Sequence, residues 1–424
     1  MKMVKKILKP FVKFLRKIKE KYRDFKAIRN FKHERQIQRT HNRIRVGFIC
    51  QYIPAWNKFE SVYNQLNRDN RFETFLICVP SGIQKNKLIS SGDIRNDTYE
   101  YFHSHGYNCI NALIGKNTWF KLETLGLDYI FYPRPYNSLM PSPYISRKVS
   151  RYTKICHIMY GMSLTKEILR TSLNRDFFRN VYYYFAESQY VAEEYKAMYS
   201  KTHIDGLQKS GYFGSPVLSL ILERENSEAS LWNFARDKYK VMWTPRWTTD
   251  LKLGGSNFFT YKDCLLQFSK EEDRLAFVFR PHPLALSNFV QTGEMTQEQA
   301  DEFVLRCHQE PRIFLDQTQE YIPTMWNSDA LITDISGVLP EYFVTGKPII
   351  YCATNMILSL AEHTKKILEG CYIVNNFDEL KQRVEMLLNG QDELKEKRKE
   401  IIEELWGKTL QHCAEMIVEE LAHC

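Results

Sequence analysis

The sequence has no apolar stretch long enough to cross a membrane and no cysteine pattern typical of metal binding. A transmembrane helix needs about 18 or more consecutive apolar residues, and no such run occurs among the 424 residues. The 10 cysteines are scattered without CxxC pairs, which favours a reduced cytosolic protein over a zinc site or a disulfide framework. The N-terminus is charged throughout and has no apolar segment of the secretory-signal kind. We therefore expect no structural metal and no cofactor.

The positive charge of the chain is confined to its first residues. The formal net charge is +9, yet residues 1–30 alone contain 12 Lys or Arg against two acidic residues. The remainder of the chain is therefore almost neutral, and we expect no nucleic-acid partner. The length and the 44% hydrophobic content allow two domains of ordinary size.

Residues 1–30 predict a basic amphipathic helix. Apolar side chains recur there at helical spacing, and Lys or Arg occupy most other positions. The apolar positions include Val4, Ile7, Leu8, Phe11, Ile18, Tyr22 and Phe25. A cationic helix of this kind lies flat on an anionic membrane surface, and packing on the protein's own surface is the alternative. Residues 1–42 are thus expected to form this helix and a linker.

The rest of the chain predicts two consecutive α/β domains, at 43–215 and 216–424. In each, short apolar runs typical of buried strands alternate with helical segments, which indicates a parallel, doubly wound sheet. In the first domain the strand candidates are 44–50, 72–79, 109–113, 129–132, 154–159 and 181–185. The segment 203–219 contains four glycines or prolines and predicts the connection between the domains.

Three polar turns follow strands of the second domain. They read Thr-Pro-Arg-Trp at 244–247, Arg-Pro-His-Pro at 280–283 and Thr-Asp-Ile-Ser-Gly at 333–337. Parallel strands end at one edge of a sheet, where open α/β sheets bind their ligands, so these turns are expected to converge. Arginines, a histidine and a helix start that converge at one edge indicate a functional site more strongly than any one of these features does. No Asp-x-Asp metal motif stands at a strand end.

The stretch 329–352 predicts a strand, a polar turn, a helix and a second strand. Unpaired N–H groups at a helix start favour phosphate, Ser336 adds a hydroxyl donor, and Gly337 allows close approach of the backbone. Alternatively, Ser336 caps the helix and Asp334 holds the turn. The pattern by itself leaves both interpretations open.

Two places in the first domain also suggest a site. Arg134 follows an apolar strand, where it can reach an anion or lie in a surface turn. The next strand contains His157, which we expect in the core, and ends before Tyr160. Gly161 then permits a tight turn, and Ser163 and its neighbours can bind phosphate or acceptor.

The three turns of the second domain, in this order and spacing, resemble the CDP-glycerol glycerophosphotransferase family, the polymerases and primases of teichoic-acid-like polymers. The last turn is the most specific, because Glu341 and a Lys-Pro-Ile-Ile strand at 347–350 follow it. The resemblance covers roughly residues 150–390. It implies a GT-B fold, with two Rossmann-like domains facing a cleft, and a peripheral location at the cytoplasmic face of the membrane.

The chain departs from the family pattern at two positions. The family has a His-Gly turn in its first half, whose histidine is taken as a catalytic base; here that turn is Tyr160-Gly161. An unperturbed phenol is a poor base near neutral pH. Gly337 stands where a second serine is common, which removes a hydroxyl but keeps the backbone donor. The catalytic base and the donor are therefore open.

The resemblance implies transfer of glycerol phosphate, or a similar polyol phosphate, from a CDP-activated donor to a hydroxyl of a lipid-linked or saccharide acceptor in cell-surface polymer synthesis, with release of CMP. His282 would serve as acid or base, and Tyr160 would orient the acceptor. The implied substrate-binding residues are Gly161, Ser163, Arg246, Arg280, Thr333, Asp334, Ser336, Gly337 and Glu341. The alternatives are a GT-B glycosyltransferase that uses a nucleotide sugar for capsule or lipopolysaccharide, and a non-catalytic membrane-bound relative.

Overall fold

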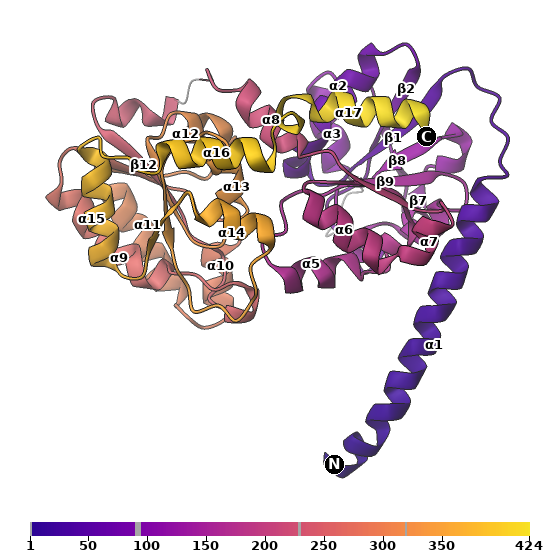
Figure 1. The fold of residues 1–424 in the computed structure, drawn as a ribbon, viewed down its shortest axis with the longest axis horizontal. Coiled ribbons are helices and arrows are strands. Elements are labelled where there is room, and N and C mark those ends of the chain that lie inside the picture. Colours follow the sequence, from indigo (N-terminus) through magenta and orange to yellow (C-terminus); the bar gives the residue numbers. More distant parts are fainter. Residues whose placement is uncertain (1, 90–94, 228–229, 319) are drawn as a thin grey trace. The chain divides into compact units, whose positions relative to one another are not determined.

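The computed structural model describes residues 2–89, 95–227, 230–318 and 320–424. The described chain divides into two compact units, each built around its own parallel sheet (Figure 1). The N-terminal unit comprises Met1–Tyr160, Arg170–Pro216 and His412–Cys424, and the C-terminal unit comprises Gly161–Leu169 and Val217–Gln411. Two segments therefore differ from the predicted ranges 43–215 and 216–424. Residues 161–169 belong to the C-terminal unit, and residues 412–424 belong to the N-terminal unit.

Local contacts explain both exchanges. The segment 161–169 forms a β-bridge from Thr165 to Leu360, and the Lys166 amide donates to the Ser359 carbonyl at 2.8 Å. At the other end of the chain, α17 (Thr409–His423) buries apolar side chains of its last three turns in the N-terminal core. A helix that the sequence places after the C-terminal unit therefore completes the N-terminal one.

The N-terminal unit holds a seven-stranded sheet in the order β11-β10-β9-β8-β1-β2-β5. All neighbouring strands pair in parallel, which confirms the predicted sheet. Its strands are β1 (Ile44–Cys50), β2 (Phe72–Cys78), β5 (Cys109–Asn111), β8 (Tyr129–Phe131), β9 (Lys154–Ile158), β10 (Val181–Ala186) and β11 (Lys209–Tyr212). The strand order reverses between β1 and β8, and such a switch point opens a crevice at the carboxyl ends of the strands.

Helices and two small hairpins accompany this sheet. The helices are α2 (Asn57–Arg68), α3 (Asp97–Ser104), α4 (Ser146–Val149), the second half of α5 (Lys166–Leu173), α6 (Gln189–Met198) and α7 (Ser200–Ile204). The hairpins pair β3 (Ile83–Gln84) with β4 (Lys87–Leu88) and β6 (Leu113–Gly115) with β7 (Thr118–Trp119).

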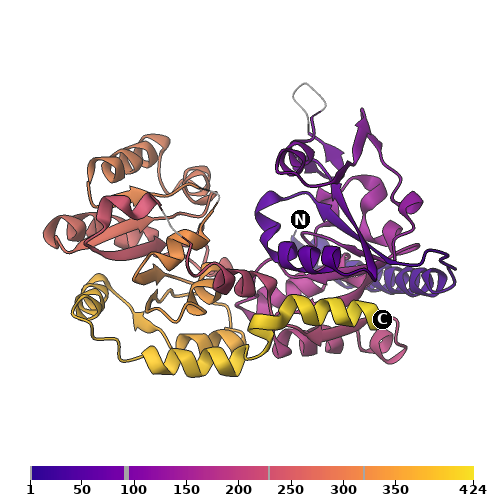
Figure 2. The ribbon, with the colours of Figure 1, turned by 90° about the horizontal axis from the view of Figure 1, so that it is seen from above.

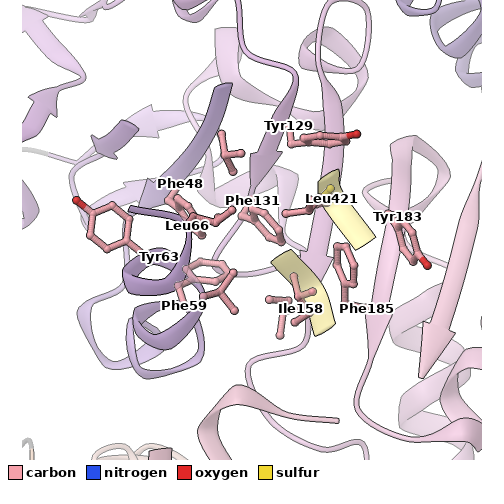
Figure 3. Close-up of a cluster of buried hydrophobic side chains, with 14 of the residues drawn as sticks. Phe48, Phe59, Tyr63, Leu66, Tyr129, Phe131, Ile158, Tyr183, Phe185 and Leu421 are labelled. Atoms are coloured by element: carbon pink, nitrogen blue, oxygen red, sulfur yellow. The ribbon is translucent and has the colours of Figure 1, made fainter. Parts of the chain in front are cut away.

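Aromatic side chains dominate the core on one face of this sheet. Phe48 of β1 stacks on Phe131 of β8 with ring centroids 5.0 Å apart, and Phe59 of α2 meets Phe48 edge-on at 5.5 Å. Leu421 of α17 lies in the same cluster (Figure 3). Each fully buried side chain of this size contributes about 1.5–3 kcal/mol, so α17 is part of the N-terminal fold rather than an appendage.

The C-terminal unit holds a six-stranded parallel sheet in the order β14-β13-β12-β15-β16-β17. Its strands are β12 (Tyr239–Thr244), β13 (Leu275–Phe279), β14 (Ile313–Leu315), β15 (Ala330–Thr333), β16 (Ile349–Cys352) and β17 (Tyr372–Val374). Here the order reverses between β12 and β15, so the second switch point lies where two of the predicted polar turns begin.

Helices cover both faces of this sheet (Figures 1 and 2). They are α8 (Pro216–Glu223), α9 (Phe258–Glu271), α10 (Ala285–Gln291), α11 (Gln297–Gln309), α12 (Ile322–Trp326), α13 (Val338–Phe343), α14 (Glu362–Leu368), α15 (Phe377–Leu388) and α16 (Lys395–Leu405). Along β12, Val241 and Trp243 join one hydrophobic cluster while Met242 joins another. Burial on both faces is why these strands are apolar throughout.

The N-terminal basic segment forms one helix, α1 (Lys2–Glu34), which continues beyond the predicted residue 30. Its side chains at 2–13 and 16, including Val4, Ile7, Leu8 and Phe11 of the predicted apolar face, lie outside the described residues. Glu20 and Asp24, the two acidic residues of the first 30, both pair with Arg179 of the N-terminal unit. No helix among the described residues is both long and apolar enough to span a membrane.

Candidate active site

The polar turns of the C-terminal unit lie side by side at the carboxyl edge of its sheet. Thr244, the last residue of β12, pairs in register with Thr333, the last residue of β15. On the other side, Trp243 pairs with Phe279, which directly precedes Arg280. The strand order therefore gathers the three turns as the sequence predicts.

Asp334 is the hub that joins these turns. Its buried carboxylate accepts hydrogen bonds from the Arg246 amide at 2.8 Å and from the Asn257 amide at 3.3 Å. Burial raises the pKa of Asp334 to about 6, and the backbone donors and the Arg246 cation oppose that rise. One side chain thus fixes the turn after β12 and the loop before α9 to the turn after β15.

Thr333 also serves the backbone. Its Oγ1 donates to the Thr244 carbonyl at 2.9 Å and accepts from Thr244 Oγ1 at 3.0 Å. Thr333 is buried and locks the ends of β12 and β15 together. The observed contacts of Thr333 and Asp334 therefore hold neighbouring strands and loops in place. Their predicted contact with substrate stays a prediction.

Arg246 supplies a half-buried positive charge at this edge, and Asp334 holds its backbone amide. Its guanidinium donates to the Ile335 carbonyl, while its Nε is buried without a hydrogen-bond partner. Burial lowers the pKa of Arg246, and the field of Asp334 opposes this. An arginine held in this way is preorganised to meet an anion, because its remaining donors are already desolvated.

A glycine loop packs against Arg246. Gly254 has φ +109°, and a Cβ there would lie 2.5 Å from Ile335 Cγ2 and 3.2 Å from Arg246 Nε. The position therefore requires glycine both for its backbone conformation and for space. Thr354 Oγ1 fixes the loop by donating to the Gly254 carbonyl at 2.7 Å.

The turn after β15 leads into α13 through Ser336 and Gly337. Ser336 Oγ accepts from the Val338 amide at a long 3.4 Å, which is a weak cap. Gly337 has an ordinary helical φ of −58°, so its conformation does not require glycine. A Cβ at this position would meet no atom within 4 Å, so the missing side chain leaves open space in front of the turn.

Glu341, in the first turn of α13, has an unusually high pKa for a carboxyl group. Burial raises the pKa of Glu341 to about 7, and a hydrogen bond from Tyr321 opposes the rise. A carboxyl group of this kind changes its charge near neutral pH. The predicted contact of Glu341 with substrate stays a prediction.

His282 is held as a neutral imidazole. Its Nδ1 accepts from the Leu284 amide at 3.1 Å, and its ring lies 6.2 Å from that of Trp247. Burial lowers the pKa of His282, and the nearby Arg246 cation lowers it further. Since Nδ1 is occupied as an acceptor, the proton of the neutral ring sits on Nε2. His282 in this tautomer offers a donor and no free basic nitrogen.

Arg280 has a structural partner. Its guanidinium pairs with the buried carboxylate of Asp316 and donates to the Thr318 carbonyl at 2.7 Å. These bonds hold the loop after β14 against the Arg-Pro-His-Pro turn. The predicted contact of Arg280 with substrate therefore has to compete with this ion pair.

The predicted first-half residues are divided between the two units. Tyr160 ends the first segment of the N-terminal unit and is 41% exposed. Burial of the phenol and its hydrogen bond with Tyr136, at 3.2 Å between the hydroxyl oxygens, raise the pKa of Tyr160. The hydroxyl thus stays neutral at physiological pH and offers a hydrogen bond instead of a base.

Gly161 and Ser163 belong to the C-terminal unit. Gly161 does not adopt a left-handed conformation, and a Cβ there would meet nothing within 4 Å. Neither the backbone conformation nor the available space therefore requires glycine at this position, and the predicted contact of Gly161 with substrate stays a prediction. The Ser163 carbonyl is bonded to His363 Nε2 at 3.0 Å, which ties this segment to α14.

His157 is buried in β9 as predicted for a core residue. Its ring packs edge-on against Phe177 and Phe178, with centroids 5.3 and 5.1 Å away. Burial holds the pKa of His157 well below its usual value. Within the described ranges, no three His, Cys, Asp or Glu side chains lie close enough to share a metal ion.

The sequence interpretation missed a cationic cluster in the N-terminal unit. It comprises Lys58, Arg134 and Arg175, gathered near Tyr160. Only Arg134 was singled out from the sequence. Lys58 lies on α2 and Arg175 lies after α5, so no local pattern links them. The signal that could have found them is that Lys58 lies in the first turn of the helix after β1 and Arg175 follows the helix after β9.

The fold is similar to that of UDP-N-acetylglucosamine 2-epimerase from Neisseria meningitidis, with TM-score 0.58, 12% identity and coverage of 90% of this chain and 100% of that chain. It is also similar to the S. aureus MnaA-UDP co-structure, with TM-score 0.57, 12% identity and coverage of 90% and 96%. These likenesses show the fold, which is GT-B.

A structure of the wall teichoic acid polymerase TagF is similar over 97% of this chain and 98% of that chain, with TM-score 0.51 and 14% identity. No curated protein sequence matches the chain. The family model described as CDP-Glycerol:Poly(glycerophosphate) glycerophosphotransferase matches residues 158–408, more than half of the chain. This segment contains all three polar turns of the C-terminal unit. The chain therefore belongs to the CDP-glycerol:poly(glycerophosphate) glycerophosphotransferase family, whose members are transferases.

Proposed function

We propose that the protein transfers glycerol phosphate, or a similar polyol phosphate, from a CDP-activated donor to a hydroxyl of a lipid-linked or saccharide acceptor, in synthesis of a teichoic-acid-type cell-surface polymer. The observation that carries this proposal is the Arg246–Asp334 hub at the switch point of the C-terminal sheet, inside the segment that matches the family. Switch points are where doubly wound sheets bind nucleotides.

The donor's diphosphate is assigned to Arg246 and the open space in front of Gly337. Arg246 is fixed by Ile335 and confined beneath the Gly254 loop, so it can approach phosphate oxygens without losing side-chain freedom on binding. Ser336 adds a hydroxyl there, and Glu341 accepts from ribose hydroxyls. Thr333 and Asp334 hold this constellation in place.

The transfer itself is a phosphoryl substitution. An acceptor oxygen bonds to the phosphorus that carries glycerol, the bond from that phosphorus to the bridging oxygen breaks, and CMP leaves with the bridging oxygen. The acceptor proton passes to a base that remains unassigned. His282 donates its Nε2 proton in a hydrogen bond to the phosphate oxygens as charge develops, which preorganised donors do at low cost.

Residues 1–30 are proposed to bind the protein to the cytoplasmic face of an anionic membrane. Among the described side chains of α1, the exposed large apolar residues are Phe14, Leu15, Ile18, Tyr22 and Phe25. The two acidic residues are turned to Arg179 of the protein, so lysines and arginines supply the charge of the remaining surface. Exposed aromatic and aliphatic side chains among cations are typical of interfacial helices.

The donor is tested by nucleotide release. CDP-glycerol, CDP-ribitol and UDP-, GDP- and CMP-sugars are offered in turn with an extract of lipid-linked acceptor. We expect CMP from CDP-glycerol, with kcat lowered about 10²- to 10³-fold in His282→Ala, as for loss of one preorganised donor.

The exposed histidine of α11 provides the control, and His308→Ala should match the wild type. Release of UDP or GDP would favour the nucleotide-sugar glycosyltransferase instead. Release from no donor would favour the non-catalytic relative.

A further inference from the structure

At the carboxyl edge of the N-terminal sheet, the described residues include arginines that form no ion pair with an acidic side chain. Gln51 follows β1 and Arg134 follows β8, so both lie at the point where the strand order reverses. Arg134 donates to Gln51 Oε1 at 3.3 Å and lies over the Tyr52 ring at 4.4 Å. Its Nε is buried without a hydrogen-bond partner. Among the described residues, Arg134 forms no ion pair.

A second arginine, Arg175, also lies near Tyr160. The Arg175 guanidinium stacks over the Tyr136 ring at 4.4 Å, and its Nε is also buried without a partner. The Tyr136 hydroxyl meets the Tyr160 hydroxyl at 3.2 Å. Both arginines act on the Tyr160 phenol, since each lowers its pKa against the effect of burial. Arg175, too, has no ion pair within the described part of the chain.

Lys58 is the buried cation of this group. Its Nζ is buried, donates to the Pro133 carbonyl and to the Ile158 carbonyl at 2.8 Å, and lies 5.4 Å from the centre of the Tyr160 ring. These bonds tie the ends of β8 and β9 together. Burial and the Arg134 cation lower the pKa of Lys58, while Glu187 raises it.

The balance of charge around Tyr160 is positive. Glu187 is the acidic group whose field reaches Lys58, and its Oε2 accepts from the Tyr184 hydroxyl at 3.0 Å. For Arg134 the opposing groups are tyrosines, and no carboxylate is among them. Desolvating a cation without a counterion is costly, and such groups persist where a ligand supplies the opposite charge.

We propose that Arg134 and Arg175 bind a phosphate group of the acceptor at the carboxyl end of the N-terminal sheet. The planar guanidinium fork matches two phosphate oxygens, and the Tyr160 hydroxyl supplies a further donor near both arginines. This inference rests on the proposed function, because it names the site that recognises the acceptor. The shared chemistry is a phosphate ester, found both in a lipid diphosphate linker and in a glycerol phosphate chain end.

The assignment gives Tyr160 a role that its chemistry permits. A neutral phenol cannot remove the acceptor proton, but it can hydrogen-bond a phosphate oxygen. Tyr160 is thus a positioning residue here. Lys58 is placed too deep and is bonded too fully to touch the ligand, and it sets the strand ends from which Arg134 and Tyr160 emerge.

The test uses Arg134→Gln and Arg175→Gln in the full chain, with Arg68→Gln as the matched control, since Arg68 is an exposed arginine of α2 in the same unit. Binding is measured by calorimetry without donor, with glycerol 3-phosphate and with a short-chain prenyl diphosphate as separate probes. Each variant should weaken binding of at least one probe about tenfold or more, as expected for a lost charge-assisted hydrogen bond. The probe that responds identifies the source of the phosphate.

Steady-state kinetics provide the second readout. Both variants should raise the KM for acceptor about tenfold while the KM for the CDP-activated donor stays unchanged. Unchanged probe binding together with unchanged acceptor KM would overturn the proposal, as would a rise in donor KM alone. If the wild type releases no nucleotide from any donor, the proposed function fails, yet loss of probe binding in the variants still supports this phosphate site.

Folding of the variants is checked by thermal unfolding. Arg134→Gln removes a desolvated charge, so its Tm should not fall. If it does, Arg175→Gln and the charge-preserving Arg134→Lys carry the binding test, and Arg134→Lys should bind the probes more tightly than Arg134→Gln. Equal, unweakened binding by Arg175→Gln and Arg134→Lys would count against the proposal.

Discussion

Single polar residues at the strand ends mostly act on backbone groups. Asp334 accepts from two amides of neighbouring loops, and Thr333 bonds the last residue of the adjacent strand. Their short side chains cannot do this and also reach far toward a ligand. Ligand contact is thus left to longer or more exposed groups such as Arg246 and His282, which these two position.

Glu341 provides a prediction about pH. Because burial raises the pKa of Glu341 to about 7, the folded protein keeps a proton that the unfolded chain loses from about pH 4.5 upward. The folded state therefore loses stability as the pH rises through this window, by an amount on the order of 1–3 kcal/mol at pH 8. In Glu341→Gln no charge forms, so the difference in Tm between pH 5 and pH 8 should shrink.

The comparison requires a glutamate elsewhere in the same unit. Glu393 is exposed, and Glu393→Gln should keep the pH dependence of the wild type. Parallel Tm–pH curves for the wild type and Glu341→Gln would show that Glu341 is not the titrating group.

The loops and turns of the candidate site differ in how strictly they need glycine. Gly254 combines a positive φ with a Cβ position that Ile335 already occupies, whereas Gly337 has a helical φ and open surroundings. Gly254→Ala should destabilise the protein by about 1–3 kcal/mol, the range for strained backbone conformations. The change is measured as a shift in Tm.

Gly337→Ala is the matched substitution. It should leave Tm unchanged, because neither φ nor space opposes a methyl group, and it should raise the KM for the CDP-activated donor if phosphate fills the open space. Equal losses of stability in the two variants would contradict this account of the turns. The pair separates a glycine that the fold needs from one that the ligand needs.

The last turns of α1 anchor this helix to the N-terminal unit, so the first residues of α1 can be removed without loss of these contacts. Ala27 and Phe31 are buried, and Asn30 Nδ2 donates to the Arg147 carbonyl at 2.8 Å. Removing residues 1–18 keeps these contacts and the acidic partners of Arg179. The truncated protein should retain its Tm and donor turnover but lose binding to anionic vesicles.

Sedimentation with vesicles measures this association. Vesicles with anionic lipid are compared with zwitterionic ones, and full-length binding should weaken as salt is raised, since screening acts on exposed charges. A second variant that lacks residues 1–30 should also fail to bind the anionic vesicles. Undiminished binding to anionic vesicles after removal of residues 1–30 would place the membrane contact elsewhere.

Much of the fold was predictable from local sequence. Runs such as 44–50, 239–243 and 329–352 predict their strands and turns because short buried strands are apolar along their whole length, and a polar break marks each end. The site in the C-terminal unit was predictable for the same reason, since parallel strands present their ends at one edge. The roles within it were not, because the partners of Asp334 and Arg280 come from other loops.

The sequence by itself determined the two α/β series, the three converging turns and the basic amphipathic N-terminus, since each follows from residue periodicity within one segment. Only the tertiary structure decided which unit receives 161–169 and α17, because apolar helix faces do not specify their partners. It also decided that Arg134 and Arg175 gather about Tyr160. The physical reason is strand order: β8 pairs with β1, from which a long stretch of chain separates it, and that pairing places distant residues at one edge.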